Sequence, residues 1–432
     1  MGVVSCATTM LDQGVFQNIG AVTWDTTAKT VGFTAVSGNG YFVNTTSGAI
    51  TVTLPSSPAA GAIVGIKDYA NTADTNAITI GRNGSNIQGT AADYLINTEG
   101  RSVLLVYVDA TKGWLVTSAS QASDIITPEF ITATGGTITT SGDYKIHTFT
   151  GPGTFCVSAV GNPLGSDSVD YLVIAGGGGG AGGGAGAGGY RESSGAASGC
   201  YTTSPLGSCV SALSVSVTGY PVTVGAGGTG RPNACSPCQS TSAKLGSNSS
   251  FSSITSTGGG GGLQWGSACG SGSLGDSNTQ GGSGGGGGQR GATARHGAGN
   301  TPPVSPPQGN DGGCNQASGG ESGGSGGGGG ATAAGSNGTT GQGGPGGAGA
   351  TSSINATPTI RAGGGGGGGR AAPGSTAGTG GPGGGGAGSP NSTGTAGTAN
   401  TGGGGGGGGF SGSYQTGGNG GSGVVIIRYK FQ

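Results

Sequence analysis

Apolar and polar positions alternate along the first part of the chain in the pattern of β-strands. The stretches 40–55, 62–70 and 102–109 are rich in Val, Ile, Thr and aromatic residues, and Ser-Gly, Asn-Gly and Pro separate them. This rhythm predicts an antiparallel, sandwich-like β domain over residues 21–119. Residues 1–20 lie ahead of it and are predicted to attach the chain to another protein.

The strand pattern begins again after a short break. Residues 120–129 have the composition of a linker, and residues 130–170 return to a sequence of strand, turn and strand. A second β element is therefore expected before the composition changes.

From residue 171 onward, strand-like pieces pass directly into runs of glycine. The sequence YLVIA at 171–175 continues into GGGGGAGGGAGAGG, and the same kind of junction recurs at 220–228, 254–262, 358–369 and 398–409. This recurrence indicates an irregular internal repeat whose period varies with the intervening loops. Flexible linkers, the usual meaning of Gly-rich sequence, need not recur around strands.

The last strand-like segment, VVIIRYKF at 424–431, is strongly apolar and needs a partner, for which 171–175 is the candidate. If these two segments pair, the glycine runs between them must travel out and back. Glycine can do so in left-handed polyproline-II-type helices of about 3.1 Å per residue, which pack closely because no Cβ separates them. Residues 171–432 of this all-β chain are therefore predicted to form a polyglycine-II helix bundle on a small β base.

The loops at the far ends of the glycine runs are predicted to gather at one tip, because the strand-like pieces share a base. These loops are 190–211, 229–246, 263–280, 331–342, 370–378 and 410–417. They concentrate rings and cations in a chain with only 5% aromatic and 7% charged residues, which predicts a contact surface. The residues predicted to bind a receptor are Tyr190, Arg191, Tyr201, Arg231, Lys244, Trp265, Arg370, Phe410 and Tyr414.

Composition limits the functions open to the chain. Glycine supplies 112 of the 432 residues and only 31% are hydrophobic, so no single large core can form. The formal net charge of -1 provides no basic face for nucleic acid or for an anionic membrane surface. No apolar run approaches the roughly 20 residues that span a bilayer, and the amino terminus lacks a secretory pattern. We expect no nucleic-acid partner and no membrane insertion.

Catalytic motifs are scarce in this sequence. His147 and His296 lie in no recognisable nucleophile or metal motif, and we expect an ordinary sheet position for the first and a solvated loop for the second. Gly-x-Gly-x-x-Gly arises here from composition, since no β-α-β unit surrounds the runs. The 16 acidic residues leave open a carboxylate pair, as in a polysaccharide depolymerase. The main expectation is a protein without enzyme activity, catalytic residues, metal or cofactor.

The eight cysteines leave three kinds of chemistry open. The motif CSPC at 235–238 has the spacing of a metal site, and Cys269 or Cys314 could add ligands, although the wider spacing is unlike a zinc ribbon. A disulfide, for instance between Cys200 and Cys209, would stiffen an exposed loop instead. Free thiols are the third alternative.

Together these features resemble the glycine-rich receptor-binding tips of tailed-phage fibres. The resemblance rests on ATGGTITTSGDYKIHTFTGPGTF, the following DYLVIAGGGGG, the AGGGGGGG blocks and the closing GGSGVVIIRYKF, and it covers residues 130–432. It implies a polyglycine-II sandwich whose distal loops bind an outer-membrane protein or a surface glycan of the host. The segment 38–69 is also similar to β domains of phage fibres and baseplate-attached proteins, which are often trimeric.

The resemblance implies a structural protein of the virion, part of a tail fibre that is assembled in the host cytoplasm and is extracellular on release. Its partners would be the host receptor and other tail or baseplate proteins, and a homotrimer is expected from fibre architecture. A self-assembling extracellular or virion filament is the alternative, and an ice-binding bundle a further one. The tip rings and cations also have a simpler interpretation, in which they pack over the ends of the rods or keep the protein soluble.

Overall fold

The computed structural model describes residues 10–12, 15–17, 22–118, 128–162, 164–199, 201–232, 243–263, 278–289, 294–316 and 323–432. These residues form β-strands, turns and a three-residue 3-10 helix at Pro205–Gly207, so the chain is all-β. Among them, no helix has the length and apolarity to cross a bilayer. The chain divides into two compact units, Met1–Glu129 and Phe130–Gln432, and a short hairpin of β1 (Met10–Asp12) and β2 (Val15–Gln17) opens the first.

Two sheets share one core in the first unit. Alternate side chains of both sheets point inward, as the two-residue period of a strand requires, and Val43, Val52, Ile66, Ile80 and Leu105 are fully buried. One sheet has the order β11 (Gly113–Val116), β10 (Ser102–Asp109), β7 (Ile63–Asp68), β5 (Asn39–Val43), β3 (Thr23–Lys29). The other has the order β4 (Phe33–Thr34), β6 (Ile50–Thr53), β8 (Ile78–Gly81), β9 (Tyr94–Ile96).

Strand pairing in this unit corrects the expectation of an antiparallel domain. β3, β5 and β7 are parallel to one another, as are β4, β6 and β8, whereas β9, β10 and β11 pair antiparallel with their neighbours. From β3 to β8 the chain alternates between the two sheets, so that consecutive strands are never hairpin partners. Apolar and polar residues alternate identically in either orientation, which is why the sequence pattern did not distinguish them.

Two further sheets stand at one end of the second unit, and we call this end the sheet end. The strands of residues 130–170 pair with those that flank the glycine runs, so the expected second β element is part of this unit. One sheet has the order β12 (Thr132–Thr134), β15 (Gly153–Ala159), β19 (Gly219–Thr223), β20 (Ser249–Phe251), β21 (Ile254–Ser256). The other has the order β13 (Thr137–Ser141), β14 (Tyr144–Phe149), β24 (Val424–Lys430), β16 (Ser168–Ile174), β17 (Tyr190–Glu192), with β18 (Leu213–Ser214) also paired to β16.

β16 and β24 lie side by side in the middle of this second sheet. They are antiparallel, with Tyr171 opposite Ile427 and Leu172 opposite Ile426, which confirms the predicted pairing of the two apolar segments. Tyr171 and Ile427 face the core between the two sheets. Leu172 and Ile426 face a smaller core that includes residues of β22 (Ala350–Ser352) and of the glycine segments. Burial on both faces explains why these strands are continuously apolar instead of alternating.

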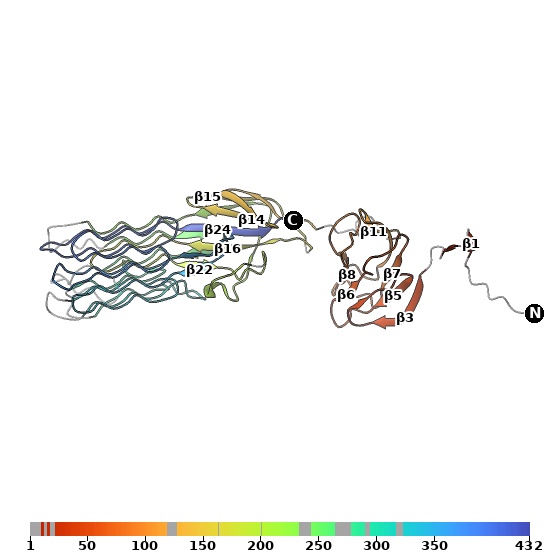
Figure 1. Cartoon of the computed structure of the whole chain (residues 1–432), viewed down its shortest axis with the longest axis horizontal. Coiled ribbons are helices and arrows are strands. Elements are labelled where there is room, and N and C mark those ends of the chain that lie inside the picture. Colours follow the sequence, from red (N-terminus) through yellow and green to blue (C-terminus); the bar gives the residue numbers. More distant parts are fainter. Residues whose placement is uncertain are drawn as a thin grey trace, which may run out of the picture. The chain divides into compact units, whose positions relative to one another are not determined.

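Glycine segments run away from the sheet end and return to it (Figure 1). The segments that follow β16, β19, β21 and β23 (Thr359–Arg361) lead outward, and others lead back into β17, β20, β22 and β24. Their backbone N–H groups donate to carbonyl groups of neighbouring segments. Segments far apart in the sequence are thereby held together by backbone hydrogen bonds.

These hydrogen bonds repeat every three residues. Gly177 and Gly180 both donate to the segment that returns to β24, at Gly421 and Gly418, with N···O distances of 2.9 and 2.8 Å. The two residues between them donate to other segments. A glycine segment therefore bonds to neighbours in several directions, whereas a β-strand bonds only to the strands on its two edges.

Candidate functional site

The outer turns of the glycine segments gather at the end of the second unit opposite its sheets (Figure 1). Isolated bridges connect some of them, since Arg370 pairs with Phe410 and Gln342 pairs with Thr376. We call this end the tip. Its described turns are 181–183, 339–342, 370–377, 389–393 and 410–415.

Two aromatic rings and a guanidinium group lie together at the tip. Phe410 and Tyr414 belong to one turn, and their ring centroids are 5.1 Å apart at an interplanar angle of 52°. The guanidinium carbon of Arg370 is 5.9 Å from the centroid of the Phe410 ring, within the range of a cation–π interaction. All three side chains are partly exposed. Apolar ring faces beside a cation are groups that bind sugars and acidic side chains.

Arg231 ends the segment that leaves β19 and is only 4% exposed. Its backbone N–H donates to the carbonyl of Gly180 at 2.9 Å, and its carbonyl accepts from the N–H of Gly417 at 3.0 Å. Burial lowers the pKa of its guanidinium, while the nearby hydroxyl of Tyr414 acts in the opposite direction. We name Arg231, Arg370, Phe410 and Tyr414 the tip cluster.

Two other predicted residues fall in or near this region. Lys244 is exposed on the segment that returns to β20, and its carbonyl accepts from the N–H of Gly179, close to the turn at 181–183. Trp265 lies outside the described residues. The structure thus brings four of the predicted residues together at the tip and places a fifth beside the same end.

Tyr190, Arg191 and Tyr201 lie at the sheet end, which corrects the prediction that they stand at the tip. Tyr190 and Arg191 are in β17, and Tyr190 is 1% exposed. The ring of Tyr201 lies 5.1 Å from the guanidinium carbon of Arg428, on the last strand of the chain. Their positions follow from a turn at 181–183, which returns the first glycine segment to the sheets.

Length is the signal that could have revealed this turn. The run GGGGGAGGGAGAGG would extend roughly 43 Å at about 3.1 Å per residue, twice the reach of the later run at 363–369. A bundle with ends in register requires the longer run to fold back. The predicted loop 331–342 is divided in the same way, because Ala331 is buried beside the sheet and only 339–342 lies at the tip.

A buried polar network holds the loop after β17 to the sheet end. The fully buried carboxylate of Asp170 accepts hydrogen bonds from Ser193 Oγ at 2.7 Å and from both the N–H and Oγ of Ser198 at 2.6 Å. Glu192 accepts from the N–H of Ser204 at 2.9 Å, and burial raises its pKa. The sequence did not single out these carboxylates, because their partners lie beyond the range of any local motif.

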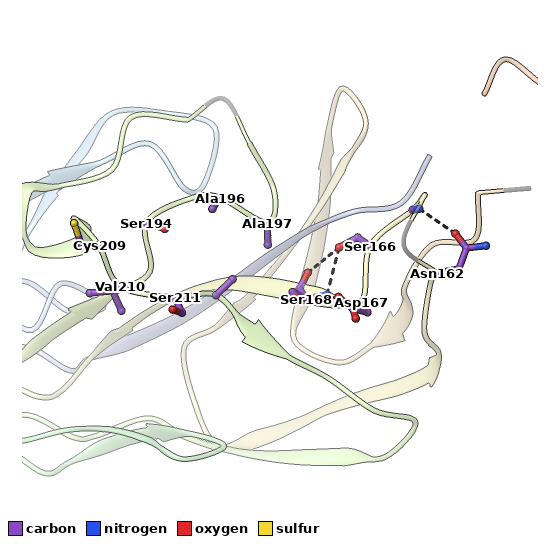
Figure 2. A pocket seen from close by; sticks show the side chains of 12 residues that line it. Asn162, Ser166, Asp167, Ser168, Ser194, Ala196, Ala197, Cys209, Val210 and Ser211 are labelled. Carbon is purple, nitrogen blue, oxygen red and sulfur yellow. Dashed lines mark hydrogen bonds between the residues drawn. The ribbon is translucent and has the colours of Figure 1, made fainter. Parts of the chain in front are cut away.

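A hollow of about 570 Å³ opens at the sheet end between Asn162, the segment 165–168 and the loops 194–197 and 209–212 (Figure 2). Its described lining consists mostly of serine and alanine side chains, with the carboxylate of Asp167, which accepts from Ser168 Oγ at 2.8 Å. No histidine and no second carboxylate are among these lining residues. The hollow therefore offers a polar surface without an acid and base pair.

His147 occupies the ordinary sheet position that the sequence predicted. It is buried in β14, with Nδ1 2.7 Å from the carbonyl oxygen of Gly135 and Nε2 3.1 Å from the hydroxyl of Tyr429. Burial lowers its pKa. Both ring nitrogens have partners within the sheet, so this histidine has a structural setting.

His296 is exposed and lies beside Cys314 and Asp311. Its Nδ1 is 3.3 Å from Cys314 Sγ, and its Nε2 is 3.9 Å from Asp311 Oδ2. Burial raises the pKa of the Cys314 thiol, which is the opposite of what a thiolate nucleophile needs. Within the described ranges, no group of three His, Cys, Asp or Glu residues is arranged to hold a metal ion.

Three of the cysteines are described, and each is a free thiol: Cys156, Cys209 and Cys314. The motif at 235–238, Cys200 and Cys269 lie outside the described residues. Because Cys209 is a free thiol, the disulfide with Cys200 is not formed in this structure. The metal hypothesis, and disulfides among the cysteines outside the described residues, stay predictions.

Comparison with known proteins adds a family. No curated protein sequence matches the chain. A family model described as a glycine-rich domain matches residues 148–430, from the end of β14 to the last residue of β24, and so covers more than half of the 432 residues. The chain therefore belongs to this glycine-rich domain family.

Proposed function

We propose that this chain is a structural, non-enzymatic protein of a phage tail fibre that recognises a host cell surface through the loops at its tip. The observation that carries the proposal is the tip cluster, which places two aromatic rings and two guanidinium groups at the end of the second unit opposite its sheets. These are groups that bind a partner, and they include neither a nucleophile nor a general base at neutral pH.

We also infer that the glycine segments are polyglycine-II helices. A helix with three residues per turn directs every third N–H group to the same neighbour, and this is the spacing of the hydrogen bonds from Gly177 and Gly180. None of the glycines in 363–369 or 403–409 has a positive φ in the left-handed region. This agrees with a polyproline-II-type helix, in which φ is about −75°. Such a bundle would hold the tip loops in fixed positions relative to one another.

The receptor would be a surface glycan or an outer-membrane protein of the host. Residues 1–20 would attach the chain to other tail or baseplate proteins, and the protein would act as a homotrimer in the virion, extracellular after release. The family match supports the glycine-rich architecture, and the resemblance to phage fibres supports the remainder of this assignment.

Binding of fluorescently labelled full chain to a panel of bacterial strains tests the proposal. We expect at least one strain to bind the protein. The double variant Phe410→Ala/Tyr414→Ala should bind that strain at least about tenfold more weakly. Val217→Ala is the matched control, because Val217 is 61% exposed but lies between β18 and β19 at the sheet end. Equal binding by both variants would exclude the tip as the recognition surface.

A further inference from the structure

The guanidinium group of Arg231 is buried at the tip. Its side chain is 4% exposed, and its Nε and Nη2 atoms have no hydrogen-bond partner in the part of the chain that the structure describes. A buried cation is normally paired or neutralised, because removing its charge from water is unfavourable. Two unpaired nitrogens on a buried guanidinium therefore make Arg231 a candidate site for an acidic ligand.

Among the described residues of the second unit, Arg361 and Arg428 are also buried, and Arg361 too has a nitrogen, Nη1, without a hydrogen-bond partner. These two arginines differ from Arg231 in the groups that surround them. Arg361 is 7% exposed, and the charges of Tyr190 and Glu192 raise its pKa against the effect of burial. Arg428 lies over the rings of Tyr144 and Tyr201, at 4.4 and 5.1 Å. For Arg231 the opposing influence is the hydroxyl of Tyr414, and no carboxylate of the described residues contributes to the shift.

The groups around the tip rings are suited to a sugar. Phe410 and Tyr414 supply ring faces, and the same turn carries Ser411, Ser413 and Gln415. The amide nitrogen of Gln415 lies 3.3 Å from both serine hydroxyls, so that donors and acceptors cluster beside the rings. Ring faces with adjacent hydroxyl and amide groups match a pyranose, which presents an apolar face and an edge of hydroxyls.

We propose that the tip cluster binds an acidic saccharide, with the sugar carboxylate on Arg231 and the pyranose ring against Phe410 and Tyr414. This inference rests on the proposed function and names the chemical class of its receptor. A planar guanidinium binds a carboxylate through two parallel N–H···O bonds, and Nε and Nη2 form one such pair of donors. Because Arg231 is 4% exposed, binding requires the groups that cover its guanidinium to move.

Calorimetric titration of the full chain with tetragalacturonate and with sialyllactose tests the ligand class. The neutral counterparts are the methyl ester of the first and lactose for the second. We expect at least one acidic saccharide to bind the wild type, and Arg231→Met to weaken this binding at least about tenfold. Lys112→Met should leave it unchanged, since Lys112 is an exposed cation of the first unit. Binding of neither acidic saccharide, or equal binding of the neutral counterparts, overturns the proposal.

Thermal unfolding of Arg231→Met separates a binding role from a structural one. Replacing an unpaired buried cation with an apolar side chain of similar length should leave the unfolding midpoint unchanged or raise it. A bound acidic saccharide should raise the midpoint of the wild type and not that of the variant. A midpoint that falls by about 5 °C or more would show that the guanidinium supports the fold, and the proposal would be wrong.

Binding to bacterial cells, measured in parallel, distinguishes this inference from the proposed function. If cells bind the wild type but not Arg231→Met, and no acidic saccharide binds, the receptor belongs to another class, such as an acidic protein loop. Adhesion then stands and the saccharide assignment is overturned. If an acidic saccharide binds through Arg231 and no strain binds the protein, the ligand class is supported and the adhesion function fails.

Discussion

The Nε2 atom of His147 lies 3.1 Å from the hydroxyl of Tyr429 and so joins β14 to the last strand of the chain. Burial lowers the pKa of His147 below its ordinary value of 6.5, so the unfolded chain binds a proton at this residue more readily than the folded protein does. The contribution of neutral His147 to stability is therefore complete above about pH 6.5 and is lost as the pH falls below that value.

We accordingly expect the urea concentration at the unfolding midpoint of the second unit to decrease as the pH is lowered from about 7.5 to about 5.5. Urea titrations at several pH values measure it. His147→Gln should reduce this pH dependence, because glutamine does not titrate. His296→Gln, at an exposed site, should retain it. A wild-type midpoint that does not change over this range would contradict the expectation.

Close packing of the glycine segments predicts a strong effect of single methyl groups. A Cβ on Gly177 would overlap with the carbonyl oxygen of Gly403 on a neighbouring segment, whereas a Cβ on Gly151 meets nothing within 4 Å. Gly177→Ala should lower the free energy of unfolding by about 1–3 kcal/mol, because the segments must separate to admit the methyl group. Gly151→Ala serves as the control, and denaturant unfolding of both variants should show a loss only for the first.

Asp170 is expected to be essential for the loop after β17. Asp170→Ala would leave the buried N–H and hydroxyl of Ser198 and the hydroxyl of Ser193 without their acceptor, at a cost of about 3 kcal/mol. Asp167→Ala removes an exposed carboxylate three positions earlier and should have little effect on the free energy of unfolding. Urea unfolding gives the magnitude, and limited proteolysis within 193–210 reports whether the loop detaches. Equal stability of the two variants would rule out this role for Asp170.

The three described thiols should differ in reactivity. Cys156 and Cys209 are exposed, whereas Cys314 is partly buried and its pKa is raised by burial. Native alkylation by iodoacetamide near pH 8 should therefore modify Cys156 and Cys209 several-fold faster than Cys314. Peptide mapping by mass spectrometry measures each site, and denatured protein, in which the three rates should converge, is the control. A faster reaction at Cys314 would indicate that His296 activates it.

Part of this architecture could be predicted from the sequence, because the distribution of apolar residues along the chain indicates which strands are buried. β16 and β24 are continuously apolar, and only strands covered on both faces have that composition. Their pairing, the strand-to-glycine junctions and the outward course of the glycine segments follow from this one fact. The positions of Arg370, Phe410 and Tyr414 at the ends of such segments follow in turn.

Other features depend on contacts that no local pattern carries. The turn at 181–183 contains only alanine and glycine, so nothing in its composition separates it from the segments on either side. Parallel pairing in the first unit depends on which sheet each strand joins. Glu192 accepts a hydrogen bond from Ser352, a residue 160 positions away, and such a pair has no sequence spacing to identify it.

The hydrogen bonds between glycine segments also determine how the second unit would bear a pulling force. They lie across the segments, and the segments run between the tip and the sheet end. Tension applied at the tip along the segments would load many of these bonds in shear at the same time, instead of opening them one after another. The antiparallel pair of β16 and β24 would be loaded in the same geometry, so a protein tethered at the sheet end would resist extraction of any single segment.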